Sequence, residues 1–262
     1  MSTSVGQLFD LRGRTALVTG GSRGLGLQVA QALGEAGASL ILTSRKSADL
    51  ELAARRLAEQ GIEAHWIAAD AGTASDVSRV CGEAIERLGH VDILINNAGA
   101  TWGAPAEDYP IEAWDKVMNL NVRSAFLFSQ YIAKHSMIDR RSGRIVMIAS
   151  FAAFAGVTSG REAVAYNTSK AALVNLTRAL AGEWGEFGIT VNAIAPGWFP
   201  SKMSNATLES IGVDRLMART PLRRLGDDGD LKGAAVLFAS HAGKHITGQV
   251  LAVDGGASAL NG

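Results

Sequence analysis

The chain has 262 residues, 47% of them hydrophobic, which is enough to bury one large core within a single domain. Lys and Arg together number 25, as do Asp and Glu, and this balance argues against nucleic acid or an anionic membrane surface as a partner. The lone cysteine, Cys81, excludes an intramolecular disulfide and a multi-cysteine zinc site.

Short aliphatic or β-branched runs predict strands, and stretches with helical spacing lie between most of them. In chain order the predicted strands cover residues 15–19, 39–43, 64–68, 93–95, 145–148, 190–194 and 250–253. The predicted helices cover residues 24–36, 47–60, 74–88, 111–137 and 163–187, and the fourth is divided near Asn121. Cys81 lies in the third helix, where we expect a small buried side chain.

Several of the predicted strands are apolar at consecutive positions, which is typical of strands covered on both faces. The alternation with helices predicts a doubly wound α/β fold, with a mainly parallel seven-stranded sheet and helices on both sides, in one Rossmann-like domain over residues 1–262. Residues 200–219 are less regular, and we interpret them either as a lid over a substrate site or as a surface helical excursion.

The expected environment is cytoplasmic and reducing. The N-terminus lacks a charged start followed by an apolar run, and no stretch is apolar enough to span a bilayer. The five histidines show no spacing with carboxylates or Cys81 that is typical of a metal site, so no metal is expected. The expected partner is a small molecule.

A glycine-rich turn follows the first predicted strand and leads into the first helix. Glycines at such a crossing let the backbone approach a pyrophosphate, and the helix N-terminus offers free N–H groups to it. This position favours a dinucleotide site over an ordinary turn. The candidate cofactor residues of the turn are Gly20, Ser22, Arg23, Gly24, Leu25 and Gly26.

The end of the second strand distinguishes NADP(H) from NAD(H). An acidic residue at this place binds the ribose 2′-hydroxyl of NAD, whereas this chain has Ser44, Arg45 and Lys46. Arg45, with Arg23 from the glycine turn, could pair with a 2′-phosphate through charge-assisted hydrogen bonds, so NADP(H) is favoured and NAD(H) is the second candidate. The alternative is that Arg45 and Lys46 are solvated charges that precede a helix.

The turn spaced G-x-x-x-G-x-G, the sequence NNAG at 96–99, Tyr166-x-x-x-Lys170 and Pro196-Gly197 together resemble the classical short-chain dehydrogenase/reductases, from about residue 14 to 256. The closest pattern is that of gluconate 5-dehydrogenase-like and 3-oxoacyl-thioester reductase-like members. The resemblance implies an adenine contact by Asp70 and Ala71. It places Asn97, Ala98 and Gly99 beside the adenosine ribose, and Pro196, Gly197, Phe199 and Ser201 around the nicotinamide.

Tyr166 and Lys170 are four positions apart on a predicted helix, so their side chains share a face. A neighbouring ammonium and an oxidised nicotinamide stabilise a phenolate, so we expect the pKa of Tyr166 to be lowered. In the family that the chain resembles, this Tyr is the catalytic acid/base and the Lys also holds the nicotinamide ribose. Ser150, at a strand end, would bind the substrate oxygen.

The resemblance also assigns Asn121, at the helix division, to a water on the proton relay to the lysine, and a structural role at the helix break could serve at the same time. Asn119 is a rival by residue type alone. Ser150 and Tyr166 lie 16 positions apart, more than in many members, which predicts an extension within 157–163 where Arg161 could meet an anionic substrate group. The alternative for Arg161 is an exposed loop charge. Candidate pocket residues, each of which would by default belong to core or lid packing, are Trp102, Phe151, Phe154, Trp198 and Met203.

The predicted function is NADP(H)-dependent hydride transfer between nicotinamide and a ketone/secondary alcohol pair. Two alternatives keep the fold: a cofactor-binding regulator or scaffold without turnover, and a nicotinamide-assisted dehydratase or epimerase. The resemblance further implies a homotetramer, or a homodimer, through the helices at 122–137 and 163–187.

Overall fold

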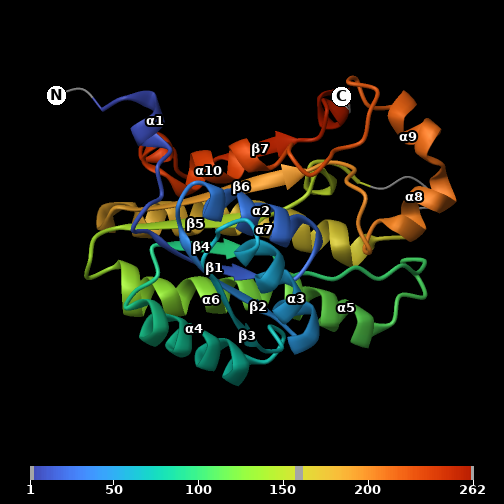
Figure 1. Ribbon diagram of the computed structural model, residues 1–262. Coiled ribbons are helices and arrows are strands. Elements are labelled where there is room, and N and C mark those ends of the chain that lie inside the picture. The colour runs from blue at the N-terminus through green and yellow to red at the C-terminus, as the bar shows by residue number, and fades with distance from the viewer. Residues whose placement is uncertain (1–2, 157–161, 261–262) are drawn as a thin grey trace.

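The computed structural model describes residues 3–156 and 162–260 (Figure 1). Within them a seven-stranded sheet has the order β3-β2-β1-β4-β5-β6-β7, and every neighbouring pair of strands is parallel. The predicted doubly wound fold is confirmed. The strands are β1 (Thr15–Thr19), β2 (Ser39–Ser44), β3 (Ala64–Ala68), β4 (Ile93–Asn96), β5 (Gly143–Ile148), β6 (Ile189–Pro196) and β7 (Val250–Val253).

Helices cover both faces of the sheet, as the apolar runs predicted. One face packs against α4 (Ala74–Leu88), α6 (Ser124–Ile132) and α7 (Val164–Trp184). The other packs against α2 (Gly24–Glu35), α3 (Ser47–Ala58) and α10 (Lys232–Ala239).

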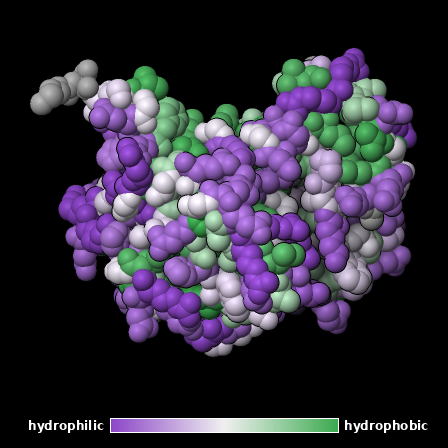
Figure 2. Space-filling model, in the orientation of Figure 1, coloured by the Kyte–Doolittle hydropathy of each residue, from purple (hydrophilic) through white to green (hydrophobic). Residues whose placement is uncertain are grey.

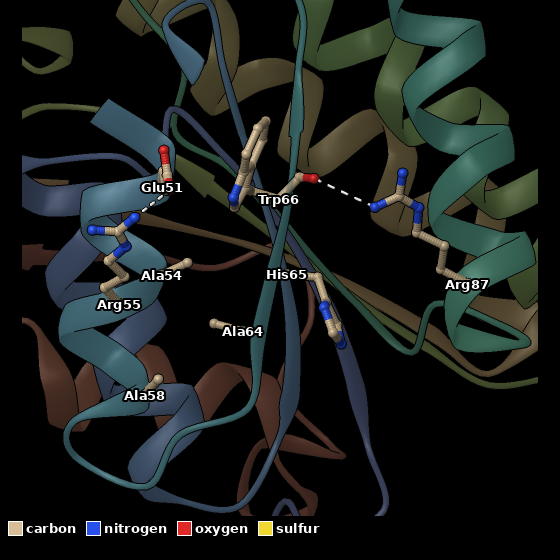
Figure 3. A pocket seen from close by; sticks show the side chains of 8 residues that line it. All are labelled: Glu51, Ala54, Arg55, Ala58, Ala64, His65, Trp66 and Arg87. Atoms are coloured by element: carbon tan, nitrogen blue, oxygen red, sulfur yellow. Dashed lines mark hydrogen bonds and ion pairs between the residues drawn. The ribbon is translucent and has the colours of Figure 1, made fainter. Parts of the chain in front are cut away.

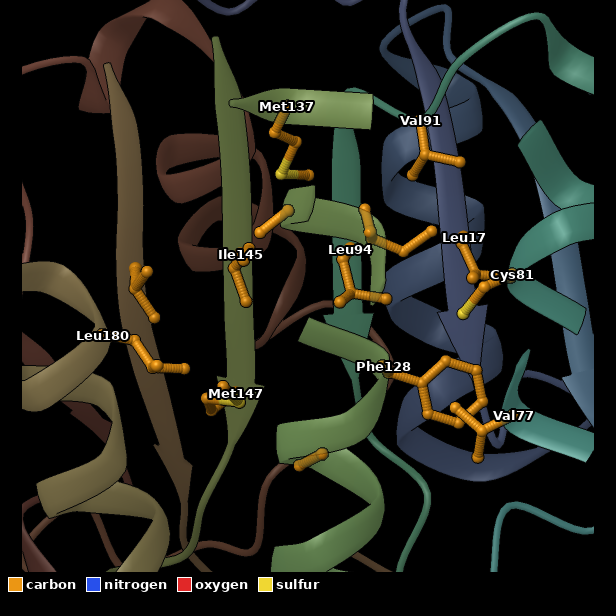
Figure 4. Close-up of a cluster of buried hydrophobic side chains, with 14 of the residues drawn as sticks. Leu17, Val77, Cys81, Val91, Leu94, Phe128, Met137, Ile145, Met147 and Leu180 are labelled. Atoms are coloured by element: carbon orange, nitrogen blue, oxygen red, sulfur yellow. The ribbon is translucent and has the colours of Figure 1, made fainter. Parts of the chain in front are cut away.

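The side chains of each strand divide between two apolar clusters, because successive residues of a strand point to opposite faces. In β1, Leu17 belongs to the cluster beneath α4 and α6, whereas Ala16 and Val18 face α2 and α3. Figure 4 shows the first cluster, in which Phe128 extends toward Val77. Cys81 lies in this cluster and is buried, as expected, and burial raises the pKa of its thiol.

The long helix predicted at 111–137 is divided at two places rather than one. Helix α5 (Ile111–Met118) passes into a π-helical turn, η1 (Asn119–Arg123), at the predicted division. A second π-helical turn, η2 (Ala133–Met137), follows α6 and was not predicted. A π turn inserts one residue into an otherwise continuous apolar stripe, and this changes the spacing too little to be seen in the sequence.

Helix α10 was missed because its sequence, KGAAVLFA, is apolar almost throughout and shows no helical period. The region 200–219 contains two short helices, α8 (Asn205–Ile211) and α9 (Val213–Ala218), which agrees with the helical interpretation of that segment. The structure also has a short N-terminal helix, α1 (Val5–Leu8), and four single 3₁₀ turns, η3 (Phe151–Ala153), η4 (Gly185–Phe187), η5 (His241–Gly243) and η6 (Ala257–Leu260).

Helices α8 and α9 stand beyond the carboxyl ends of β6 and β7 (Figure 1). Figure 2 shows hydrophilic residues over most of this face of the molecule and apolar surface gathered at α8 and α9. Met203 and Val213, at this place, are 46% and 41% exposed. Across the described ranges, no helix has both the length and the apolar character needed to cross a membrane.

Candidate active site

The carboxyl ends of the strands carry nearly all the predicted site residues. Gly20 follows β1, Asn97 follows β4, Ser150 comes two residues after β5, and Gly197 follows β6. The strand order reverses between β1 and β4, and in open α/β sheets the ligand crevice lies at this switch point. The topology alone therefore brings together residues that are far apart in the sequence.

The glycine turn is a cradle that side chains would fill. Gly20 and Gly24 have φ values of +65° and +54°, in the left-handed region that glycine adopts without strain. A Cβ at Gly26 would lie 2.3 Å from the carbonyl oxygen of Gly20 and 2.4 Å from Asn97 Nδ2. Helix α2 begins at Gly24, and its N-cap residue, Arg23, makes no side-chain capping bond. The N–H groups at this end of α2 are thus available to an anion.

Asn97 and Thr19 fix the shape of that cradle. Asn97 Nδ2 donates to the carbonyl oxygens of Thr19 at 2.9 Å and Gly20 at 3.1 Å. Thr19 Oγ1 accepts from the backbone N–H groups of Asn97 and Ala98, both at 3.0 Å. The side chain of Asn97, which the resemblance placed beside the ribose, is therefore occupied in bracing the turn between β1 and β4.

The end of β2 presents the polar group that a ribose or its phosphate would need. Ser44 Oγ is buried and has no hydrogen-bond partner among the described residues. Arg45 and Lys46 next to it are exposed, and Arg23 Nη1 lies 3.4 Å from Asp49 Oδ2 in a solvent-exposed ion pair. The glycine cradle and the orphaned hydroxyl both fit a phosphorylated dinucleotide.

The predicted adenine loop is folded on itself. Asp70 Oδ1 accepts from the Gly72 N–H at 2.9 Å, and the Asp70 N–H donates to Asp76 Oδ2 at 2.8 Å. That contact and Arg79 lower the pKa of Asp76. Asn119, the rival of Asn121, is directed to this loop, since its Nδ2 donates to the Gly72 carbonyl oxygen at 2.7 Å. Ala71, next to Asp70, is half-buried.

Tyr166, Lys170 and Ser150 meet at the start of α7. The Lys170 Nζ lies 5.6 Å from the centroid of the Tyr166 ring and donates to the Ile148 carbonyl oxygen at 2.7 Å. Ser150 is 6% exposed and shares a side-chain hydrogen bond with Tyr166. The structure therefore brings together three of the four predicted catalytic residues.

The pKa of Tyr166 differs from the expectation. Burial raises it, and the hydrogen bond with Ser150 offsets only part of that increase. Burial also lowers the pKa of Lys170 to about 8. Desolvation of both groups was invisible in their spacing, and the lowering expected from the sequence also counted the charge of a bound oxidised nicotinamide.

Asn121, the fourth residue, is 1% exposed and lies in the π-helical turn η1. Its Oδ1 accepts from the Ala100 N–H at 2.8 Å, and its Nδ2 donates to the Ala100 carbonyl oxygen and to Ser169 Oγ, both at 2.9 Å. Gly99 lies beside it, since a Cβ there would be 3.2 Å from Asn121 Oδ1. The amide thus binds protein groups on both sides, which fits the structural role at the helix break that the sequence allowed beside the proton relay.

The predicted nicotinamide end lies between β6 and α8. Gly197 passes so close to the residue after β7 that a Cβ would lie 2.6 Å from Asp254 Cα. Ser201 reaches the glycine turn, where its Cβ is 3.9 Å from the place of a Cβ on Gly24. Phe199, in contrast, is 5% exposed and packs in the core cluster, so its ring belongs to the core. Pro196 ends β6 and is buried.

The predicted pocket residues include one aromatic pair and three exposed apolar side chains. The rings of Phe151 and Trp198 meet edge to face with centroids 5.3 Å apart. Trp102, Phe154 and Met203 are exposed by 49%, 46% and 46%. The predicted extension and Arg161 fall mostly on residues 157–161, outside the described ranges.

A family model described as Enoyl-(Acyl carrier protein) reductase matches residues 20–258. The chain is 40% identical over 252 residues to the gluconate 5-dehydrogenase of Gluconobacter oxydans (strain 621H), covering 95% of this chain and 96% of that relative. The chain belongs to the short-chain dehydrogenase/reductase family. The rhamnolipids biosynthesis 3-oxoacyl-[acyl-carrier-protein] reductase of Pseudomonas aeruginosa is 39% identical, over 95% of this chain and 97% of that relative.

Solved structures agree with this membership. A gluconate 5-dehydrogenase from Burkholderia cenocepacia J2315, in complex with NADP and tartrate, superposes with a TM-score of 0.91 at 34% identity, covering 98% of this chain and 99% of that one. The predicted family and the reaction class are thereby confirmed. This short-chain dehydrogenase/reductase is an NAD(P)-dependent oxidoreductase that acts on a hydroxyl or ketone substrate.

A second hollow on this short-chain dehydrogenase/reductase lies between α3 and the edge strand β3 (Figure 3). Both arginines in it are engaged: Arg55 pairs with Glu51, and Arg87 pairs with Glu83 and donates to the Trp66 carbonyl oxygen. Its lining contains no group of the crevice described above. In the ranges that the structure describes, no three His, Cys, Asp or Glu side chains gather as a metal site.

Two residues of the site were missed from the sequence, Thr19 and Ser169. Ser169 is fully buried and lies three positions after Tyr166, on the same face of α7. That spacing was the available signal, but small hydroxyl residues are common in helices and the partner, Asn121, is distant in the sequence. Thr19, the last residue of β1, carried no signal beyond its position.

Gly26→Ala tests the cradle. The new Cβ would force the Gly20 carbonyl or the Asn97 amide to move, so we expect at least a tenfold loss of dinucleotide affinity and destabilisation by about 1–3 kcal/mol. Gly182→Ala is the control, because a Cβ there meets no described atom within 4 Å and helix propensity improves. Fluorescence titration measures the nucleotide affinity of both variants, and thermal unfolding measures their stability. Unaltered nucleotide binding by Gly26→Ala would contradict the assignment of the glycine turn to the cofactor.

Proposed function

We propose that the protein is an NADP(H)-dependent oxidoreductase of a ketone/secondary alcohol pair, in which Tyr166 is the acid/base. The observation that carries this proposal is the meeting of Tyr166, Lys170 and Ser150 at the carboxyl edge of β5. Bound NADP(H) would supply or accept the hydride. The glycine turn, Ser44, Arg45 and Ser201 would hold its phosphates and ribose.

In the reductive direction, Tyr166 gives its phenolic proton to the carbonyl oxygen of the substrate as hydride reaches the carbon. Ser150 donates a hydrogen bond to the same oxygen and stabilises the developing negative charge. The Lys170 ammonium stabilises the phenolate that Tyr166 becomes. Burial raises the pKa of the Tyr166 phenol, and this favours the protonated form that acts as an acid in reduction.

The preference for NADP(H) is supported by the exposed Arg45 and Lys46 beside the orphaned Ser44 hydroxyl. Arg45→Glu places a negative charge at the proposed 2′-phosphate position, so we expect NADPH affinity to fall at least tenfold and NADH affinity to stay within a few-fold. Arg56→Glu, on the exposed side of α3, makes the same change in net charge and should leave both affinities unchanged. Equal losses for both nucleotides in Arg45→Glu would contradict the assignment.

We propose keto sugar acids as the substrate class, because several relatives are named as gluconate or ketogluconate enzymes. The decisive experiment titrates the protein with NADPH and NADH and then follows nicotinamide absorbance with a panel of carbonyls. The panel contains 5-ketogluconate, a 3-oxoacyl thioester and a cyclic ketone. Turnover of the sugar acid supports the proposal, whereas turnover of the thioester alone redirects it to the class of the Pseudomonas relative.

Three further expectations belong to the proposal. Residues 200–219 would close over the substrate, since they begin beside the glycine turn at Ser201 and end where Thr220 contacts Gly255. The assembly would be a homotetramer in the cytoplasm, and light scattering that gives a monomer would contradict the tetramer.

Two outcomes would favour the alternative functions. Product formation without net NADPH consumption would favour the dehydratase or epimerase, and nucleotide binding without turnover on any carbonyl would favour the regulator or scaffold.

A further inference from the structure

Ser169 is the residue directly before Lys170 and has no exposed surface. Its Oγ donates to the main-chain carbonyl oxygen of Tyr166 at 2.7 Å and accepts from Asn121 Nδ2 at 2.9 Å. One hydroxyl therefore connects the backbone of the proposed acid/base to the buried amide of the π-helical turn.

The connection continues beyond Asn121. The amide of Asn121 bonds both the N–H and the carbonyl oxygen of Ala100, at 2.8 Å and 2.9 Å. Ala100 follows Gly99 in the loop after β4, at the switch point of the sheet. A continuous chain of hydrogen bonds thus runs from the loop after β4, through Asn121 and Ser169, to the main chain of Tyr166.

Tyr166 needs such support because it lies in the first turn of α7, which begins at Val164. The first N–H groups of a helix have no intrahelical acceptor, so the first turn is held less firmly than the later turns and a contact to its carbonyl groups helps to fix it. The N-cap residue, Ala163, makes no side-chain capping bond. Ser169 contacts this turn from its buried side.

We propose that Ser169 is a positioning residue, which holds the first turn of α7 so that the Tyr166 hydroxyl stays against Ser150 and beside Lys170. The proposal rests on the acid/base role given to Tyr166 in the proposed function. Asn121 holds Ser169 in place, because its position in η1 lets its amide bond Ala100 and Ser169 at the same time.

The chain offers a matched control in Ser129. It also has no exposed surface, lies in a helix, donates to a main-chain carbonyl (Ala125, 2.7 Å) and accepts from a buried amide (Asn96 Nδ2, 2.9 Å). Ser129→Ala and Ser169→Ala therefore remove the same pair of bonds from equally buried places. Any difference between the two variants reports the position of Ser169 beside Tyr166.

We expect Ser169→Ala to lower kcat about 10- to 100-fold with KM for the nucleotide within a few-fold, because small misplacement of a reacting group has effects of this size. Ser129→Ala should keep the kcat of the original protein, with a similar loss of thermal stability. Ser169→Thr retains a hydroxyl that can bond the preceding turn and should recover most of the activity.

A second readout does not depend on turnover. In protein labelled at tyrosine Cζ, carbon NMR reports the hydrogen bonding of each phenol, and Tyr166→Phe identifies the Tyr166 signal. In Ser169→Ala we expect this signal to move toward that of free tyrosine, since the bond to Ser150 loosens, whereas Ser129→Ala leaves it in place.

The positioning role is overturned if Ser169→Ala keeps both the Tyr166 signal and kcat of the original protein while losing only thermal stability. Failure of the proposed function looks different: the unaltered protein would bind no nicotinamide nucleotide and reduce no carbonyl. The Tyr166 signal still decides the positioning role in that case, because it is read in the nucleotide-free protein.

Discussion

Tyr166→Phe is expected to reduce kcat roughly 1,000-fold while NADPH still binds. The substitution removes one oxygen atom, and with it the only proton that the proposed reaction can pass to the substrate oxygen from this position; positioned acid/base groups contribute rate factors of about 10²–10⁴. The ring itself, over which Lys170 Nζ lies, is retained. Stopped-flow absorbance gives kcat, and fluorescence titration gives the affinity for NADPH.

Tyr131→Phe is the matched control for that experiment. Tyr131 packs against His135, and its hydroxyl lies by Gly82 of α4, so the same atom is removed far from α7. Its kcat should equal that of the original protein. Unimpaired turnover by Tyr166→Phe would refute the acid/base role, and loss of NADPH binding would show that the phenol acts in holding the cofactor.

Lys170→Met should abolish turnover and stabilise the protein at neutral pH. Burial lowers the pKa of Lys170 from 10.5 to about 8, so the folded protein carries an ammonium in an unfavourable place below that pH. A difference of this size corresponds to about 3 kcal/mol, of which the lost bond to the Ile148 carbonyl would cancel about 1 kcal/mol. We expect Tm at pH 7 to rise by roughly 4 °C.

The pH dependence identifies the cause of this stabilisation. Because the folded-state pKa lies below the unfolded one, the unfolded chain binds more protons between pH 8 and 10.5, and the stability contributed by Lys170 rises with pH across that window. The advantage of Lys170→Met should therefore shrink above pH 8 and vanish or reverse near 10.5. Lys134→Met, at an exposed lysine, should follow the original protein throughout. An advantage that is constant with pH would exclude the buried charge as its source.

The sheet could be predicted from the sequence because buried parallel strands leave continuous apolar runs between turn residues. All seven strands were located, and the limits of β1, β3 and β7 were correct. Helix α10 was not predicted, since the sequence of a helix without a polar face looks like that of a buried strand or another core segment. The second π turn was missed because one inserted residue hardly alters an apolar pattern.

The sequence predicted which residues would lie at the candidate site, but not the atoms that these residues contact. Tyr166, Lys170 and Ser150 were found through spacing and family pattern, and the structure brings them together. Desolvation, which raises the pKa of Tyr166, depends on the surrounding fold and was absent from the sequence argument. Asn97 was predicted at the cofactor, yet its amide braces the glycine turn, because hydrogen-bond partners are set by tertiary proximity.

The π-helical turn η1 makes hydrogen bonds to two separate parts of the site. Asn119 at its start fixes the loop of Gly72 at the predicted adenine end, and Asn121, two residues later, fixes the turn that bears Tyr166. In a regular α-helix, removal of one residue would rotate everything beyond it by about 100°. The residue that the π turn inserts therefore sets how the Gly72 loop is oriented relative to the first turn of α7. Changes in length within residues 119–123 would rotate one of these two parts of the site relative to the other.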